Sequence, residues 1–210
     1  MVLGVWVCLV TVGAPACRDR PAAPAATTSA ATTPTTAPAP SATAERLPIR
    51  PDASTIGFVG RKITASHDGR FTQFSGTIEL DPAQVERSRV NVEIQMASVQ
   101  IEPARLRGHL VSPDLFNVAQ FPTATFASTA LRAGGADGAS HTMTGNLTLH
   151  GQTRSVTFPA RINVNERAVT ATAEFSINRQ DFGITYPGMP DDLIQDQVTI
   201  RLNLTAPRGS

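Results

Sequence analysis

The sequence predicts an all-β fold of eight strands with one short helix. Apolar and polar residues alternate with a period of two in eight stretches, which is the pattern of a half-buried strand. These stretches follow one another at short separations, which indicates antiparallel neighbours. Only one stretch has helical spacing, so an alternating βαβ arrangement is excluded.

The clearest hairpin lies in the sequence TGNLTLHGQTRSVTF. Leu147 and Leu149 alternate with polar residues, and Val156 and Phe158 do so on the return strand. Gly151–Gln152 is the expected turn, with a positive φ at the glycine. One apolar row therefore faces a core and one polar row faces water.

The other elements follow from the same pattern. In chain order the predicted strands cover residues 55–59, 70–80, 89–99, 123–131, 142–149, 154–164, 168–177 and 197–204. Residues 103–110 are the predicted helix, because Pro103 suits a first helical position and Leu106 and Leu110 are four apart. Eight antiparallel strands either stack as a sandwich or close into a barrel, and periodicity leaves both open.

The N-terminal region is expected to lie outside the fold. Residues 1–16 are apolar, and a small-residue run precedes Cys17, which predicts a lipoprotein signal peptide with Cys17 as the lipidated residue. Ala14 replaces the usual leucine of such a site and no lysine or arginine precedes the apolar run, so plain export with a spare cysteine is the alternative. Residues 17–46 are rich in Pro, Ala, Thr and Ser and are expected to form a disordered tether.

Composition excludes several functions for the domain predicted at residues 47–206. The net charge of +1 argues against a nucleic-acid partner. Cys8 would be lost with the signal peptide, which leaves no thiol for a disulfide or thiolate chemistry once Cys17 is lipidated. No G-x-S-x-G motif and no H-E-x-x-H spacing is present. No catalytic residue, metal ligand or cofactor is therefore predicted, although a metal site assembled only in three dimensions stays open.

Four segments point to a family. They are IGFVGRKITASHDGRFTQFSGTIEL (56–80), GHLVSPDLFNVAQFPTATF (108–126), GNLTLHGQTRSVTFPA (145–160) and INRQDFGITYPGMPDDLIQDQV (177–198). With these segments, residues 47–206 resemble the YceI-like family of polyisoprenoid-binding, lipocalin-like proteins. The resemblance implies an eight-stranded up-and-down antiparallel β-barrel, a short helix near its mouth and a long apolar pocket for a prenyl or fatty chain.

A barrel of this kind gives two sets of candidate ligand-binding residues. The predicted pocket lining is Phe58, Phe71, Phe74, Ile94, Met96, Leu115, Phe116, Phe126, Leu147, Phe158, Phe175, Phe182 and Ile184; the alternative is that these side chains fill a closed core. The predicted mouth, which would hold a headgroup, is Lys62, His67, His109, Arg179, Asp181 and Tyr186. The alternative for the mouth is a solvated rim with local salt bridges, in which Arg179 and Asp181 pair.

The expected function is non-enzymatic binding of a long-chain amphiphile, such as a polyisoprenoid, an isoprenoid quinone or a fatty acid derivative. The binding would serve transport, storage or protection in a bacterial envelope, with the protein exported to the periplasm or cell surface and anchored to a membrane by its lipid. A structural module with a filled barrel is the alternative. An enzyme acting on a lipid or quinone would need an acid–base pair inside the pocket. A homodimer is left open.

Overall fold

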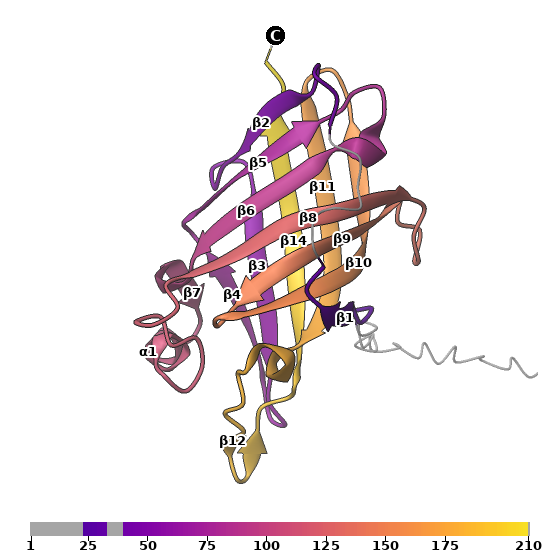
Figure 1. The fold of residues 1–210 in the computed structure, drawn as a ribbon. Coiled ribbons are helices and arrows are strands. Elements are labelled where there is room, and N and C mark those ends of the chain that lie inside the picture. The colour runs from indigo at the N-terminus through magenta and orange to yellow at the C-terminus, as the bar shows by residue number, and fades with distance from the viewer. Residues whose placement is uncertain (1–22, 33–39, 210) are drawn as a thin grey trace, which may run out of the picture.

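An antiparallel sheet curls strongly around its own apolar face (Figure 1). The structure is a computed structural model and describes residues 23–32 and 40–209. The all-β prediction is confirmed for these residues, in which α1 (Arg105–Val111) is the single α-helix. None of the helices in the described ranges is long and apolar enough to cross a membrane. The predicted signal peptide and Cys17 lie outside those ranges.

The strands are numbered along the chain. They are β1 (Thr27–Ala30), β2 (Glu45–Ile49), β3 (Thr55–Arg61), β4 (Ser66–Phe71), β5 (Phe74–Leu80), β6 (Arg89–Gln95), β7 (Val99–Ile101), β8 (Thr123–Ala133), β9 (His141–Leu149), β10 (Gln152–Val164), β11 (Ala168–Asn178), β12 (Gly188–Met189), β13 (Asp192–Leu193) and β14 (Gln197–Pro207). Short 3-10 helices lie at η2 (Val85–Arg87), η3 (Met96–Ser98) and η4 (Arg179–Phe182).

Strand pairing follows the chain for most of its length. The order in the main sheet is β2-β5-β6-β8-β9-β10-β11-β14-β3-β4-β7, and β12 pairs with β13 in a separate two-stranded sheet. The last long strand, β14, returns to pair with β3. Because β7 continues from β6 through η3 and pairs with β4, the first and last parts of the sheet meet. The resulting topology is an up-and-down barrel.

The predicted count of eight strands needs correction. Each of the eight predicted stretches contains strand, but residues 70–80 belong to two strands, β4 and β5, and residues 89–99 to β6, η3 and β7. The chain bends at Thr72 and Gln73, where the Gln73 amide donates to Ser98 Oγ at 3.0 Å and the Thr72 hydroxyl donates to the Ser98 carbonyl at 3.1 Å. This corner lets β4 pair with β7 while β5 pairs with β6. Strands β1, β2, β12 and β13 were not predicted.

The turn of the central hairpin is one residue earlier than predicted. Leu149 pairs with Gln152, so the two central residues are His150 and Gly151, with φ values of 51° and 73°. Positive φ at both positions is the geometry of a type I′ turn, which matches the twist of the flanking strands. The left-handed His150 also packs edge-on against Phe121, with ring centroids 4.6 Å apart.

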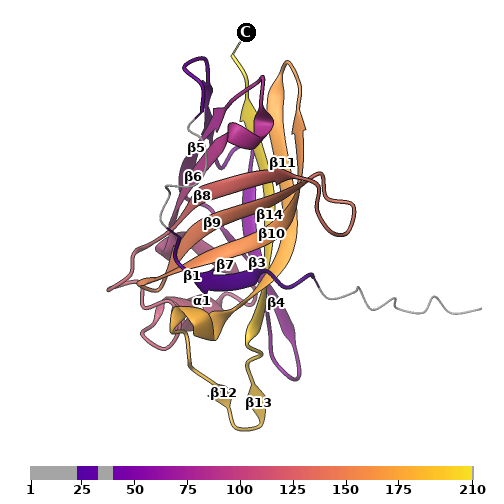
Figure 2. The ribbon, with the colours of Figure 1, turned by 45° about the vertical axis from the view of Figure 1, so that its right-hand side comes forward.

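Part of the predicted tether is a strand of the barrel. Strands β10 and β11 pair only over residues 161–164 and 169–172, and further along, β10 pairs with β1 instead. The Ala26 amide donates to the Ser176 carbonyl at 2.8 Å, and the Ser176 amide donates to the Pro24 carbonyl at 2.9 Å. Residues 23–32 therefore occupy the seam between β10 and β11 (Figure 2). They do so because two separated strand edges leave backbone groups that need partners.

Candidate functional site

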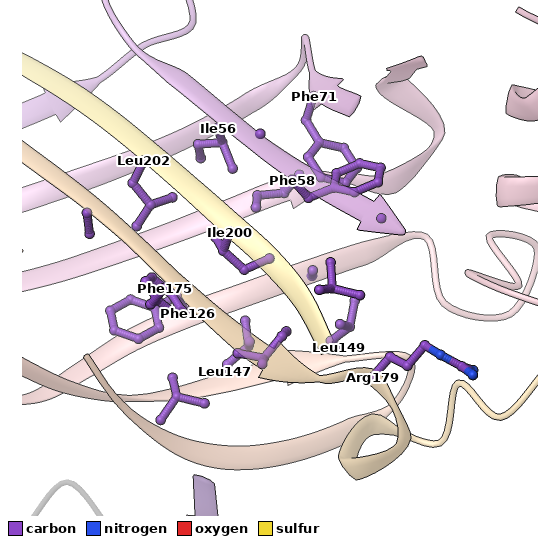
Figure 3. Close-up of a pocket in the computed structure, with 18 of the residues that line it drawn as sticks. Ile56, Phe58, Phe71, Phe126, Leu147, Leu149, Phe175, Arg179, Ile200 and Leu202 are labelled. Atoms are coloured by element: carbon purple, nitrogen blue, oxygen red, sulfur yellow. The ribbon is translucent and has the colours of Figure 1, made fainter. Parts of the chain in front are cut away.

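A cavity of about 290 Å³ lies inside the barrel. Its lining comes mainly from apolar side chains of alternate strand residues. Strand β14 contributes Val198, Ile200, Leu202 and Leu204, and Figure 3 shows Ile200 and Leu202 facing the same space as side chains from other strands. The volume is close to the lower end of the range for ligand-binding cavities.

Two groups of aromatic rings shape this space. Phe58, Phe71 and Phe116 have ring centroids 5.7 to 6.2 Å apart, and Phe116 comes from the chain after α1. Along the sheet, Phe158 stacks on Phe175 at 4.0 Å and lies 5.9 Å from Phe126. Ile56, Ile200 and Leu202 line the same cavity, so a flexible chain would contact both aromatic rings and branched aliphatic residues.

Most residues of the predicted lining meet at this cavity. Those that line it are Phe58, Phe71, Ile94, Met96, Leu115, Phe116, Phe126, Leu147, Phe158, Phe175 and Ile184. Phe74 and Phe182 do not, and their prediction is corrected. Phe74 follows the bend between β4 and β5 and packs with Ile49 and Ile78 in a core cluster, whereas η4 turns Phe182 into a second cluster, where it is fully buried.

Several lining residues were not predicted. They include Ile56, Ile78, Val90, Val92, Leu106, Leu110, Met143, Leu149, Val156, Ile162, Ile177, Ile194 and the apolar row of β14. Most of them share the alternating positions that identified the strands. Assigning to the lining every apolar residue on the inward-facing side of each strand would therefore have identified them.

The polar side chains of the lining are nearly all basic or imidazole groups. They are Arg61, Lys62, His67, His109, Thr172 and Arg179, and the lining holds no carboxylate in the described ranges. All except Thr172 lie at the end of the barrel formed by the β3–β4 turn, α1 and the 179–196 segment, which is called the mouth from here on. Such a set suits a headgroup that accepts hydrogen bonds, such as a carbonyl, carboxylate or phosphate oxygen.

Two predicted mouth residues lie outside the lining. Asp181 uses its backbone carbonyl to accept a hydrogen bond from Arg154 Nε at 3.0 Å, and its side chain is not part of the cavity. Tyr186 does not line the cavity either. Its ring packs edge-on against the ring of His109, with the two centroids 5.0 Å apart. Arg61 lines the cavity instead and was not predicted.

Arg179 lines the cavity, but its guanidinium already donates hydrogen bonds to other groups of the protein. Its Nη1 donates to the Ile184 carbonyl at 2.6 Å, and its Nε donates to the Gln195 carbonyl at 3.2 Å. Its Nη2 bonds to Asp196 at 2.9 Å and to the Ile194 carbonyl at 3.3 Å. The pairing with Asp181, which belonged to the alternative interpretation of the mouth, is not formed, because Arg179 pairs with Asp196 instead. At 5% exposed, Arg179 holds both ends of the 184–196 segment at the mouth.

The other polar groups of the mouth make fewer contacts within the protein than Arg179 does. Lys62 Nζ donates to Asp192 Oδ2 at 2.8 Å, and this hydrogen bond holds the pKa of Asp192 below its usual value. His67 Nδ1 lies 3.2 Å from the Glu102 carbonyl, and His109 Nε2 lies 3.3 Å from Asp114. Within the described residues no group of three or more His, Cys, Asp or Glu side chains is arranged to hold a metal ion.

Relatives of known sequence share this domain. A UPF0312 protein of Pseudomonas putida strain W619 is 34% identical over 139 residues, which cover 63% of this chain and 71% of the relative. A UPF0312 protein of Pseudomonas syringae pv. tomato is 33% identical over 137 residues, which cover 62% of this chain and 70% of the relative.

Solved structures share the fold. BcnA of Burkholderia cenocepacia superposes with a TM-score of 0.67 at 25% identity, covering 75% of this chain and 99% of BcnA. A polyisoprenoid binding domain from Saccharophagus degradans superposes with a TM-score of 0.60 at 16% identity, covering 77% of this chain and 98% of that domain. The YceI-like domain family matches residues 48–206. The chain therefore belongs to the YceI-like family.

Proposed function

We propose that this domain binds the hydrocarbon chain of one long-chain amphiphile inside the barrel and holds its headgroup at the mouth. The observation that carries the proposal is the distribution of polarity in one cavity: apolar side chains line its length, and basic and imidazole groups gather at one end. Away from the mouth, a flexible hydrocarbon finds apolar area and, among the described residues, no polar side chain except Thr172, while the headgroup stays near water.

The chemistry of the ligand follows from the same distribution. A polyisoprenoid, an isoprenoid quinone or a fatty acid derivative combines a hydrocarbon chain with oxygen atoms that accept hydrogen bonds. The fold shared with a polyisoprenoid binding domain supports the first of these. The binding is non-enzymatic and serves transport, storage or protection, and the apolar leader before Cys17 supports a place in the cell envelope.

Native mass spectrometry of the full-length protein purified from its own host tests the proposal. We expect a species heavier than the polypeptide by the mass of one lipid, which is released on denaturation. Repeated recovery of empty protein, together with no uptake of prenyl or fatty ligands in vitro, would contradict binding and would favour a structural module.

A pair of tryptophan variants locates the ligand. Ala173 lines the cavity, so Ala173→Trp should fill the lumen and weaken binding by about ten-fold or more, which corresponds to ~1.4 kcal/mol. Ala133, at the exposed end of β8, lies outside the lining, so Ala133→Trp is the matched control and should bind as the parent does. Equal binding by both variants would place the ligand elsewhere.

A further inference from the structure

Three large apolar side chains are exposed in the described part of the chain. They are Ile63, Met189 and Leu193, with 67%, 59% and 45% of their surfaces accessible. Ile63 is in the turn between β3 and β4, and the other two belong to the β12–β13 hairpin. Single exposed apolar residues are common on protein surfaces. These three lie together on two adjacent projections, and a group of exposed apolar side chains is typical of an interaction site.

The two projections are fastened to each other. The Ile63 amide donates to the Leu193 carbonyl at 3.2 Å, and the Gln195 amide donates to the Arg61 carbonyl at 2.8 Å. Asp192 adds side-chain bonds, because it accepts from Lys62 Nζ at 2.8 Å and from the Thr64 hydroxyl at 2.9 Å. The three exposed side chains therefore sit on one braced structure, called the apolar tip from here on.

The apolar tip adjoins the mouth of the cavity. Lys62 and Ile194 line the cavity and are the immediate sequence neighbours of Ile63 and Leu193, and Arg61, two residues before Ile63, also lines it. Figures 1 and 2 show the β12–β13 hairpin projecting from this end of the barrel, beyond the ends of β3 and β14. Pro24 and Ala26 also bond to the backbone of Ser176, three residues before Arg179.

We propose that the apolar tip inserts into the interfacial layer of a phospholipid bilayer and holds the mouth against the membrane. Interfacial segments bury apolar side chains about 5–10 Å into the boundary between headgroups and acyl chains, a depth that short projecting turns can reach. This proposal rests on the proposed binding of an amphiphile, whose hydrocarbon chain would otherwise have to cross water to enter the barrel.

The charges around the tip define the kind of membrane contact. Lys62 is paired with Asp192, and Asp191 lies next to it in the sequence, so the tip carries no surplus of positive charge. Docking is therefore driven by apolar burial rather than by attraction to anionic lipid. We expect similar binding to vesicles of phosphatidylcholine alone and of phosphatidylcholine with phosphatidylglycerol, with little effect of added salt.

A single-cysteine label tests the insertion directly. In the full-length chain, Cys8→Ser and Cys17→Ser remove both native thiols, and Leu193→Cys or Asp52→Cys carries an environment-sensitive nitrobenzoxadiazole group. Asp52 is exposed in the turn before β3 and so lies at the opposite end of that strand from Ile63. Because each label reports only its own surroundings, vesicle binding by the apolar leader does not decide the result.

The expected result is specific to the tip. With vesicles, the label at position 193 should shift to the blue, resist iodide in the water and be quenched by doxyl-labelled phosphatidylcholine, while the label at position 52 should stay exposed. Labels that both remain in water, or that are buried equally, would overturn the proposal. A blue shift without vesicles that grows with protein concentration would also overturn it, because the tip would then join two copies of the chain.

Ligand transfer separates this proposal from the proposed function. The triple variant Ile63→Ser, Met189→Ser and Leu193→Ser should take up a pyrene-labelled fatty acid from vesicles about ten-fold more slowly, and from solution as fast as the parent. The variant Ile63→Leu, Met189→Leu and Leu193→Ile keeps the apolar character and should behave as the parent in both assays. Unchanged uptake from vesicles by the serine variant would overturn docking alone, whereas no uptake by the parent from either source would contradict amphiphile binding.

Discussion

Small residues decide where the aromatic rings of the cavity lie. A Cβ atom at Gly145 would stand 2.3 Å from Phe126 Cζ and 2.8 Å from the Ala127 carbonyl oxygen, and one at Gly69 would stand 2.3 Å from Phe58 Cζ. Both rings line the cavity. The outer end of each ring therefore occupies the space that a side chain on a glycine of the neighbouring strand would fill, and the shape of the lumen depends on the missing side chain.

Gly145→Ala should destabilise the protein and change its cavity. The Ala127 carbonyl belongs to the backbone and cannot move away easily, so we expect the free energy of unfolding, measured with urea, to fall by about 1–3 kcal/mol. Lipid uptake should also weaken, because the new methyl group displaces the Phe126 ring. Gly108→Ala is the control, since a Cβ there meets nothing within 4 Å and alanine favours a helix by ~0.8–1.0 kcal/mol. Equal stability of the two variants would show that the Phe126 ring moves at no cost.

Arg179 shows the limit of residue-level prediction. Its position near a strand end made it a candidate for headgroup binding, but its guanidinium bonds to Ile184, Ile194, Gln195 and Asp196. A charge this deeply buried needs such partners, because leaving it unpaired would be costly. Its role is to position the segment that carries the apolar tip.

At the scale of elements, β1 has the most unexpected role. Its composition of small and polar residues predicts disorder, but the strand edges of β10 and β11 offer backbone partners that the composition cannot reveal. Asn146 adds a side-chain contact, because its Nδ2 donates to the Thr32 carbonyl at 2.6 Å and its Oδ1 accepts from the Thr32 amide at 3.0 Å. Between them these bonds attach residues 23–32 to the barrel.

Ala26→Pro should open this seam. Proline removes the amide that donates to the Ser176 carbonyl, so we expect a loss of about 1 kcal/mol of stability and faster hydrogen exchange at residues 154–157 of β10. Ser29→Ala keeps every backbone donor of β1 and should leave the exchange unchanged. Equal exchange in both variants would mean that β1 contributes nothing to closing the barrel.

For the whole molecule, three carboxylates join distant parts of the chain. Hydrogen bonds from Arg208 near the C-terminus lower the pKa of Glu45 in β2. Burial raises the pKa of Asp81. The hydrogen bonds that its carboxylate accepts from the amides of Ser41, Gln84 and Ala83 have the larger combined effect, so the pKa is lowered. Hydrogen bonds from Lys62 and Thr64 outweigh desolvation and lower the pKa of Asp192 at the tip.

Stability should therefore fall in acid. A carboxyl group with a lower pKa in the folded state stabilises the protein above its unfolded pKa, and this contribution is lost as the pH falls through the folded pKa. With ordinary values of 4.5 for Glu45 and 3.8 for Asp81 and Asp192, the urea midpoint should be flat above about pH 5 and should decline below it. Asp81→Asn should make the decline shallower, and an unchanged decline would assign the acid sensitivity to other groups.

The amino-acid sequence predicted the longer strands, the helix and the faces that carry the apolar residues, because a period of two and a period of 3.6 are local properties of the chain, but it did not predict β1, β2, β12 or β13. With the family resemblance, it also predicted the cavity, and eleven of the thirteen apolar residues named for its lining do line it. The folded molecule alone shows the bend between β4 and β5, the burial of Phe74 and Phe182, the partners of Arg179 and the place of β1. Each of these depends on which distant strand edge or buried charge needs a partner, and that need arises only when the sheet curls.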